Sequence, residues 1–195
     1  MSRRLPVGAA LGFYAVLFGA AVLWRSVLCG EPLLFADAAA AQAGLHPLRD
    51  GALGTLCGLA AARASTWTES HTVWGLRLAA ELRGLVGKLS RGEALALALA
   101  SGFAEEAFFR GALQPRVGLV AASALFGLVH LPATRGLRAW TALALASGVG
   151  LGLLFEATGS LVAPVTAHVV LNALGLWSLA GEAQAGSLPS DMAGR

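Results

Sequence analysis

SGFAEEAFFRGAL, residues 101–113, places two glutamates and an arginine inside a stretch of apolar and small residues. The uncharged residues before it extend the stretch to Ala94–Leu113. This length is close to the about 20 helical residues that cross a bilayer. Ionisable side chains in such a helix cost about 2.5–3.5 kcal/mol each on insertion scales, so they are usually functional. The stretch therefore predicts a transmembrane helix that carries a polar site.

The composition of the whole chain supports a membrane protein. Of the 195 residues, 56% are hydrophobic and 13% are charged, whereas soluble domains are about one quarter charged. We expect an all-α, polytopic transmembrane helical bundle of about six spans, with the lipid bilayer as its first partner. The net charge of +3 is spread along the chain without a basic stripe, so no nucleic-acid partner is expected. The composition does not decide the oligomeric state.

Apolar runs divide the chain into regions. A first span is predicted at 5–24; a cleavable signal peptide is the rival interpretation, although the run is long and Arg25 follows it directly. Four later spans are predicted, at 94–113, 117–131, 139–155 and 161–179. Pro115 is expected to end the first of these four and Pro132 the second, because proline disrupts a helix. Between the first span and these later ones, 51–65 is predicted as a short span or a re-entrant segment. The segment 74–89 has the pattern of an amphipathic interfacial helix. The predicted regions are thus an N-terminal membrane region (1–92), a helical core (93–181) and a disordered tail (182–195).

Lysine and arginine lie mostly on one side of these spans. This bias favours a cytoplasmic N-terminus. Isoleucine is absent while Ala, Gly, Leu and Arg dominate, which is typical of a GC-rich bacterial genome. We therefore expect a multi-pass protein of a bacterial inner (cytoplasmic) membrane.

Helical spacing pairs the polar residues of the later spans. Glu106 and Arg110 are four residues apart and share a helix face, so they should form an ion pair. Glu105 points about 100° away and has no such local partner, which leaves it free to act as a general base. In other spans, His168 and Asn172 share one face. Depth below the membrane face can be counted from the ends of the predicted spans at ~1.5 Å per residue. On this count Glu105 and His168 lie at matching depth, whereas His130 lies ~6 Å deeper.

Three short motifs together resemble a known family. EEAFFR (105–110) fits EExxxR, FGLVH (126–130) fits FxxxH, and HVVLN (168–172) fits HxxxN. Their order resembles the CPBP family of intramembrane peptidases, which includes the type II CAAX prenyl endopeptidases and bacteriocin-processing or immunity proteins. The resemblance covers about residues 94–178.

The resemblance implies a glutamate-type intramembrane endopeptidase without a cofactor. Glu105, helped by His130, would activate a water molecule, and His168 with Asn172 would stabilise the oxyanion. Glu106 and Arg110 would hold the site together, and Phe126, one turn before His130, would support its ring. The expected substrate is a membrane-anchored or secreted peptide or protein, cleaved in a precursor or in a C-terminal sorting tail.

Several alternatives stay open. Glu105, His130 and His168 could bind Zn²⁺ as an intramembrane metalloprotease, although no HExxH helix is present. A non-catalytic scaffold or a bacteriocin self-immunity protein would need no unpaired glutamate, and a transporter is a more distant alternative. No Ser, Cys or Thr has a convincing catalytic partner; Ser101, one turn before Glu105, is interpreted as a small packing residue.

Overall fold

The structure is a computed structural model that describes residues 6–131 and 137–185. The described chain is all-α, as expected. Its helices are α1 (Val7–Val22), continued by the π-helical segment η1 (Leu23–Leu28), α2 (Ala38–Ala43), α3 (Pro47–His71), α4 (Val73–Val86), α5 (Arg91–Glu106), continued by the π-helical segment η2 (Ala107–Leu113), α6 (Gln114–Val129), α7 (Arg138–Thr158) and α8 (Val162–Ala185).

Local signals in the sequence explain where several helices begin and end. Ser90 and Glu93 form a reciprocal capping box at the start of α5, in which each side chain accepts from the other residue's backbone N–H. Thr72 caps α4 with one hydrogen bond, in which its hydroxyl oxygen accepts from the N–H of Gly75. Gly159 ends α7 in the left-handed conformation, with φ 71°, which costs a glycine little.

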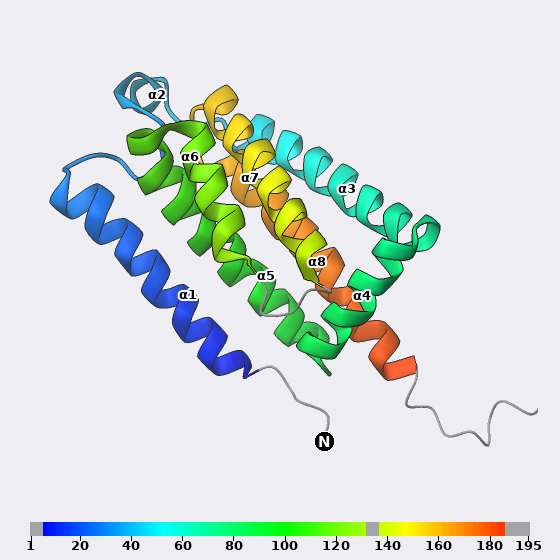
Figure 1. Cartoon of the computed structure of the whole chain (residues 1–195). Coiled ribbons are helices and arrows are strands. Elements are labelled where there is room, and N and C mark those ends of the chain that lie inside the picture. Colours follow the sequence, from blue (N-terminus) through cyan, green and yellow to red (C-terminus); the bar gives the residue numbers. More distant parts are fainter. Residues whose placement is uncertain (1–5, 132–136, 186–195) are drawn as a thin grey trace, which may run out of the picture.

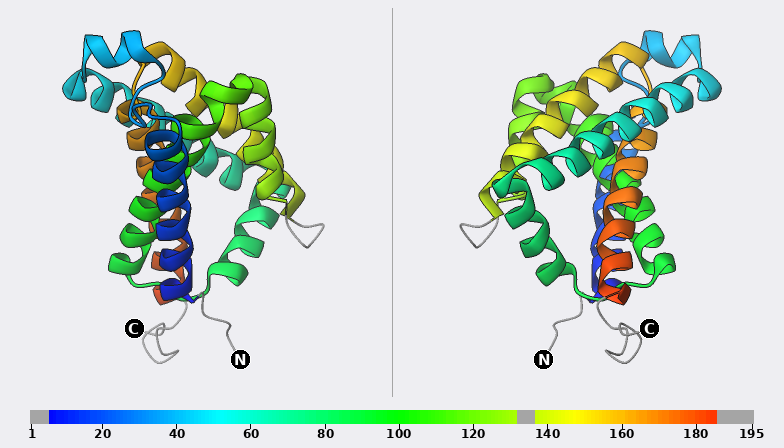
Figure 2. Two further views of the ribbon diagram at one scale, coloured as in Figure 1. Left: turned by 90° about the vertical axis from the view of Figure 1, so that its left-hand side faces the viewer. Right: turned by 90° about the vertical axis from the view of Figure 1, so that its right-hand side faces the viewer.

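The long helices form two groups that lean apart (Figures 1 and 2). The helices α1, α5 and α8 stand side by side, with α5 packed between α1 and α8, and α3 lies along the other side of α8. The α6–α7 pair is inclined to this group and packs onto it through η2 and α8. The segment α5–η2 is therefore central, because α1, α6 and α8 all contact it.

Among the described residues, three helical stretches are long and apolar enough to cross a membrane. They are Val7–Leu28, Arg91–Val129 and Arg138–Thr158, and Val162–Ser178 forms a shorter apolar helix. Their length and composition indicate a multi-pass membrane protein.

The bend in the second of these stretches lies at a different residue from the predicted one. Pro115 does not end the helix, since the helical backbone continues from η2 through Gln114 and Pro115 into the first turn of α6. The backbone instead breaks at Gly118, whose φ of 81° is a conformation that side chains disfavour. After Gly118, α6 packs back against η2 and carries His130 to its C-terminal end.

Other boundaries also differ from those predicted. The segment predicted as 51–65 is the longer helix α3, and the amphipathic segment 74–89 is α4, which ends at Val86. The helix α8 continues to Ala185, into the start of the predicted tail, and 186–195 lies outside the described residues. Pro132 lies outside them as well.

Two glycines allow α3 to approach α8 closely. Gly54 and Gly58 are spaced as in a GxxxG motif, the small-residue pattern of membrane helix contacts. A Cβ on Gly58 would lie 2.7 Å from the carbonyl oxygen of Ala167, and one on Gly54 would collide with the carbonyl of Ala163. Because α8 carries His168 and Asn172, this contact helps to set the position of both side chains.

A buried aspartate ties α3 to the connection between α7 and α8. Asp50 is fully buried and accepts hydrogen bonds from Ser160 Oγ at 2.9 Å and from Arg49 Nε at 2.8 Å. The same connection pairs with the segment before α2, since Leu161 N donates to Leu34 O and Ala36 N donates to the carbonyl of Gly159. These contacts hold the N-terminal end of α8 in place.

Arg25 anchors the segment after the first span. Its side chain is 4% exposed and lies 2.5 Å from a carboxylate oxygen of Glu31. The other oxygen of Glu31 lies 2.8 Å from Arg116, in the first turn of α6. The loop after η1 is thereby fastened to the hairpin that carries the polar site.

Candidate active site

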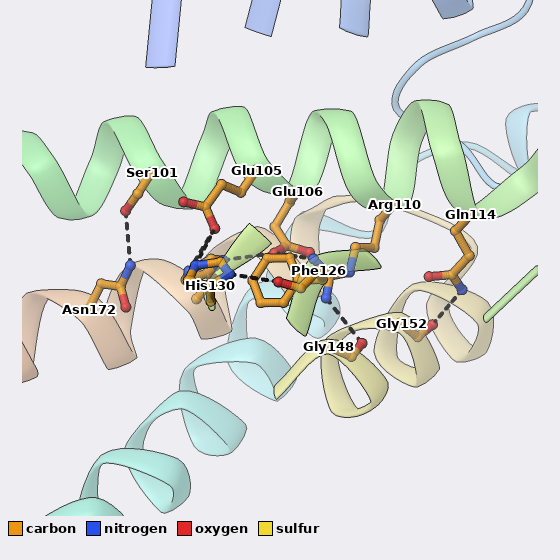
Figure 3. Close-up of polar contacts among 11 residues, drawn as sticks. Ser101, Glu105, Glu106, Arg110, Gln114, Phe126, His130, Gly148, Gly152 and Asn172 are labelled. Carbon is orange, nitrogen blue, oxygen red and sulfur yellow. Dashed lines mark hydrogen bonds and ion pairs between the residues drawn. The ribbon is translucent and has the colours of Figure 1, made fainter. Parts of the chain in front are cut away.

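Polar side chains line one side of the α5–η2 helix and α6 that follows it (Figure 3). The five residues are Ser101 and Glu105, four positions apart, and Glu106, Arg110 and Gln114, also at steps of four, and each is at most 7% exposed. They face α7 and α8, which supply their partners. The π-helical segment η2 begins directly after Glu106, and π-helical turns are frequent at functional sites.

Glu106 is the centre of a buried charge network. Its Oε1 atom accepts from Arg110 Nη1 at 3.0 Å and from His168 Nδ1 at 2.7 Å. The other end of the Arg110 guanidinium donates to the backbone carbonyl of Gly148 on α7 at 3.0 Å. Glu106 therefore connects η2, α7 and α8, and its charge is balanced by that of Arg110.

Glu105 has different surroundings. Its Oε2 atom lies 3.8 Å from Nε2 of His130 and 4.0 Å from Nε2 of His168, beyond direct hydrogen-bond distance. This oxygen is buried and has no hydrogen-bond partner among the described residues. A buried carboxylate oxygen without a donor is costly. Oε2 of Glu106 also has no partner among the described residues, so what distinguishes Glu105 is the proximity of two imidazole Nε2 atoms.

The hydrogen bonds of the two imidazoles assign their ring nitrogens. His168 Nδ1 faces a carboxylate oxygen, and His130 Nδ1 lies 2.7 Å from the carbonyl oxygen of Phe126, so both Nδ1 atoms donate. In a neutral ring the Nε2 atom then carries a lone pair. In a doubly protonated ring Nε2 donates instead, so Glu105 Oε2 lies within 4.0 Å of two nitrogens that can each accept or donate a hydrogen bond.

Phe126 packs at the centre of these groups. Its ring centroid lies 4.7 Å from that of His130 and 6.1 Å from that of His168. The guanidinium carbon of Arg110 lies 4.5 Å from the Phe126 centroid, a cation–π contact. Phe126 therefore contacts both imidazoles and the arginine, and restricts the movement of all three.

The structure brings the predicted residues together with three that sequence reasoning missed. Asn172 Nδ2 donates to Ser101 Oγ at 2.9 Å, and Gln114 Nε2 donates at 3.1 Å to both the carbonyl of Gly152 and the carboxylate of Glu156. Tyr14, the single tyrosine of the chain, approaches Glu105 from α1 closely enough to interact with its carboxylate. Ser101 lies four positions before Glu105, and Gln114 lies eight positions after Glu106, so helical spacing could have identified both. Tyr14 could have been identified as a polar side chain within a predicted span.

The groups around Glu105 are too widely spaced for the ligand set of the zinc alternative. Ligand atoms of a tetrahedral zinc site with bonds of 2.0–2.1 Å lie about 3.3–3.4 Å apart. The two distances from Glu105 Oε2 are 3.8 and 4.0 Å. In the described part of the chain, no group of three His, Cys, Asp or Glu side chains has the arrangement of a metal site.

Comparisons with known proteins agree with the motifs. Residues 89–174 match the family described as type II CAAX prenyl endopeptidase Rce1-like. This match confirms the resemblance based on the three motifs for residues 89–174. All the candidate residues except Tyr14 lie within the matched range.

An uncharacterized protein of Bacillus subtilis (strain 168), YpbD, is 40% identical to the chain over 80 residues. The alignment covers 40% of this chain and 41% of that relative, so the shared part is about two fifths of each protein. No solved structure matches the chain significantly.

Proposed function

We propose that the protein is an intramembrane endopeptidase of the glutamate type. The observation that carries this proposal is the unpartnered Glu105 Oε2 atom, within 4.0 Å of the Nε2 atoms of two histidines. A water molecule at this point would donate one hydrogen to the carboxylate and would be a nucleophile for a peptide carbonyl. The match of residues 89–174 to a peptidase family supports the same reaction.

The proposed reaction begins with the removal of a proton from this water. Glu105 takes the proton while the water oxygen bonds to the carbonyl carbon, and His130 orients the water through Nε2. The tetrahedral intermediate then breaks its C–N bond, and Glu105 returns the proton to the leaving amine. Water exclusion around the buried site strengthens each of these electrostatic interactions.

His168 and Asn172 would stabilise the negative oxygen of the intermediate. Asn172 contributes an amide N–H of its side chain. Because His168 Nδ1 already donates to Glu106, the ring can donate to the oxyanion only through Nε2–H, in its doubly protonated form. Glu106 and Arg110 would keep that ring in position.

We further propose that the site lies within a six-span protein of a bacterial inner membrane. Val7–Leu28, the α5–η2 part of Arg91–Val129, and Arg138–Thr158 would be three of these spans. The helical core at 93–181 would carry out the chemistry, and the region before residue 93 would support it. The substrate would be a membrane-associated precursor or a protein with a C-terminal sorting tail.

The test compares protein termini in membrane and secreted fractions. The strains are wild type, a deletion, and the deletion complemented with Glu105→Gln or with Glu81→Gln at equal expression. Glu81 is an exposed glutamate on α4 and provides a matched control for the loss of one carboxylate. We expect a set of processed termini to vanish in the deletion and in the Glu105→Gln strain, and to return fully with Glu81→Gln. If Glu105→Gln restores every terminus, the peptidase proposal is wrong and a scaffold or self-immunity protein is the better explanation.

A further inference from the structure

The side chain of Asn172 is held by a serine that belongs to none of the three motifs. Asn172 Nδ2 lies 2.9 Å from Ser101 Oγ, and the Ser101 hydroxyl donates to the carbonyl of Ala98 at 3.3 Å. Ser101 is 4% exposed, on α5 one turn before Glu105. Figure 3 shows the two side chains pointing toward one another from α5 and α8.

This pair of hydrogen bonds determines the direction of the Asn172 amide. A serine hydroxyl has a single hydrogen, and that of Ser101 is donated to Ala98. Its oxygen can then only accept, so the NH₂ group of Asn172, rather than its carbonyl oxygen, must face Ser101. One N–H of the amide is bound by Ser101, and the second has no partner in the part of the chain that the structure describes.

We propose that Ser101 is a positioning residue that orients the Asn172 amide so that its free N–H meets the oxyanion. This inference rests on the proposed function, in which Asn172 stabilises the tetrahedral intermediate. An amide turned by 180° would present a carbonyl oxygen to the negative charge and would oppose its formation. Ser101 disfavours that orientation, because its hydroxyl would have to give up the hydrogen bond to the Ala98 carbonyl in order to donate to the Asn172 carbonyl oxygen.

The orientation can be measured without any substrate. Asn172 is the only asparagine in the chain, so labelling with ¹⁵N-asparagine produces one side-chain NH₂ signal pair in an NMR spectrum. We expect one of its two hydrogens to exchange with solvent more slowly, because Ser101 binds it. Ser101→Ala should remove this difference, whereas Ser123→Ala should preserve it. Ser123 is a matched control, since it is 2% exposed and its hydroxyl has no partner among the described residues.

Two results of this measurement would overturn the proposal. Equal exchange of both hydrogens in the wild-type protein would mean that the amide is not held through its NH₂ group. A slow hydrogen that persists in Ser101→Ala would mean that another group holds it. Neither result depends on catalysis, so failure of the positioning role is distinguishable from failure of the peptidase proposal, which the Glu105→Gln strain tests.

Processing rates in the complemented strains test whether the orientation of the Asn172 amide affects the proposed peptidase activity. Ser101→Ala should slow the appearance of processed termini on the order of tenfold, the equivalent of about one hydrogen bond. Ser101→Thr, which retains the hydroxyl, should restore most of the rate. In an Asn172→Ala background, Ser101→Ala should have no further effect, because its role is exercised through Asn172. A full additional loss in that background would contradict the proposal.

Discussion

Glu105 and Glu106 are adjacent in the sequence but have different charged neighbours. Oε1 of Glu106 accepts from Arg110 and from His168, whereas Oε2 of Glu105 lies 3.8 and 4.0 Å from the Nε2 atoms of His130 and His168 and has no hydrogen-bond partner among the described residues. One helical step of about 100° separates them, so Glu106 points toward the charge network and Glu105 toward the two Nε2 atoms. Stability and catalysis should therefore depend on different members of the pair.

The first prediction compares Glu105→Gln with Glu106→Gln. Glu105→Gln should reduce processing by roughly 10²–10⁴-fold, the usual contribution of a general base, and change the free energy of unfolding by less than about 1 kcal/mol. Glu106→Gln should destabilise the protein by about 3–5 kcal/mol, because it leaves Arg110 buried without a counter-charge. Thermal unfolding in detergent and the rate of terminus processing measure the two effects. Equal destabilisation by both substitutions would show that Glu105 is also structural.

The second prediction concerns the contact between α3 and α8. Gly58→Ala should destabilise the fold by about 1–3 kcal/mol, because its Cβ would lie 2.7 Å from the Ala167 carbonyl oxygen and 2.8 Å from Val170 Cβ. Gly51→Ala is the control on the same helix, since its Cβ would meet nothing within 4 Å. That substitution should be neutral or stabilising by about 0.4–1 kcal/mol.

Unfolding midpoints of the two variants provide the comparison. Processing by Gly58→Ala should also fall, because α8 carries His168 and Asn172. A Gly58→Ala protein as stable and active as Gly51→Ala would mean that α3 does not set the position of α8.

The third prediction concerns Asp50 and Ser160. Asp50→Ala should cost about 2–3 kcal/mol, because it leaves the buried Ser160 hydroxyl without its charged acceptor. The loss of Arg49 as a partner adds little, since the Arg49 side chain is 60% exposed. In a double-mutant cycle with Ser160→Ala, the coupling energy should be about 1.5–3 kcal/mol. Strict additivity of the two substitutions would rule out this hydrogen bond as the link between α3 and α8.

The fourth prediction separates the glutamate mechanism from the zinc alternative. Purified protein treated with excess EDTA and 1,10-phenanthroline should still cleave a quenched peptide that spans a bond found in the termini comparison. Elemental analysis should find zinc well below one atom per chain. Loss of cleavage upon chelation, followed by recovery with added Zn²⁺ alone, would favour a metalloprotease in which Glu105, His130 and His168 close around the ion.

Local relationships within one helix could be predicted from the sequence. The ion pair between Glu106 and Arg110 and the packing of Phe126 on His130 each join residues four positions apart. Such neighbours meet on any helix, because they share one face whatever the surrounding fold. The apolar composition likewise indicates a helical membrane protein, since bilayer length constrains the helices directly.

Contacts between residues of different helices could not be predicted from spacing along the chain. Simple helix rise placed His130 ~6 Å deeper than Glu105, yet the two side chains lie 3.8 Å apart, because the chain reverses at Gly118 rather than at Pro115. The hydrogen bond from Arg110 to Gly148 and the one from Asn172 to Ser101 also join separate helices.

The sequence by itself therefore determined the chemical groups and their local pairs. The tertiary structure decided which groups meet across helices, because close approach at small residues such as Gly54, Gly58 and Gly102 sets how far each helix slides past the next. A shift of one residue along a helix moves a side chain by ~1.5 Å and turns it by about 100°. No spacing within a single helix specifies that shift, so the geometry around Glu105 follows from the packing of α1, α6 and α8 against α5–η2 and of α3 against α8.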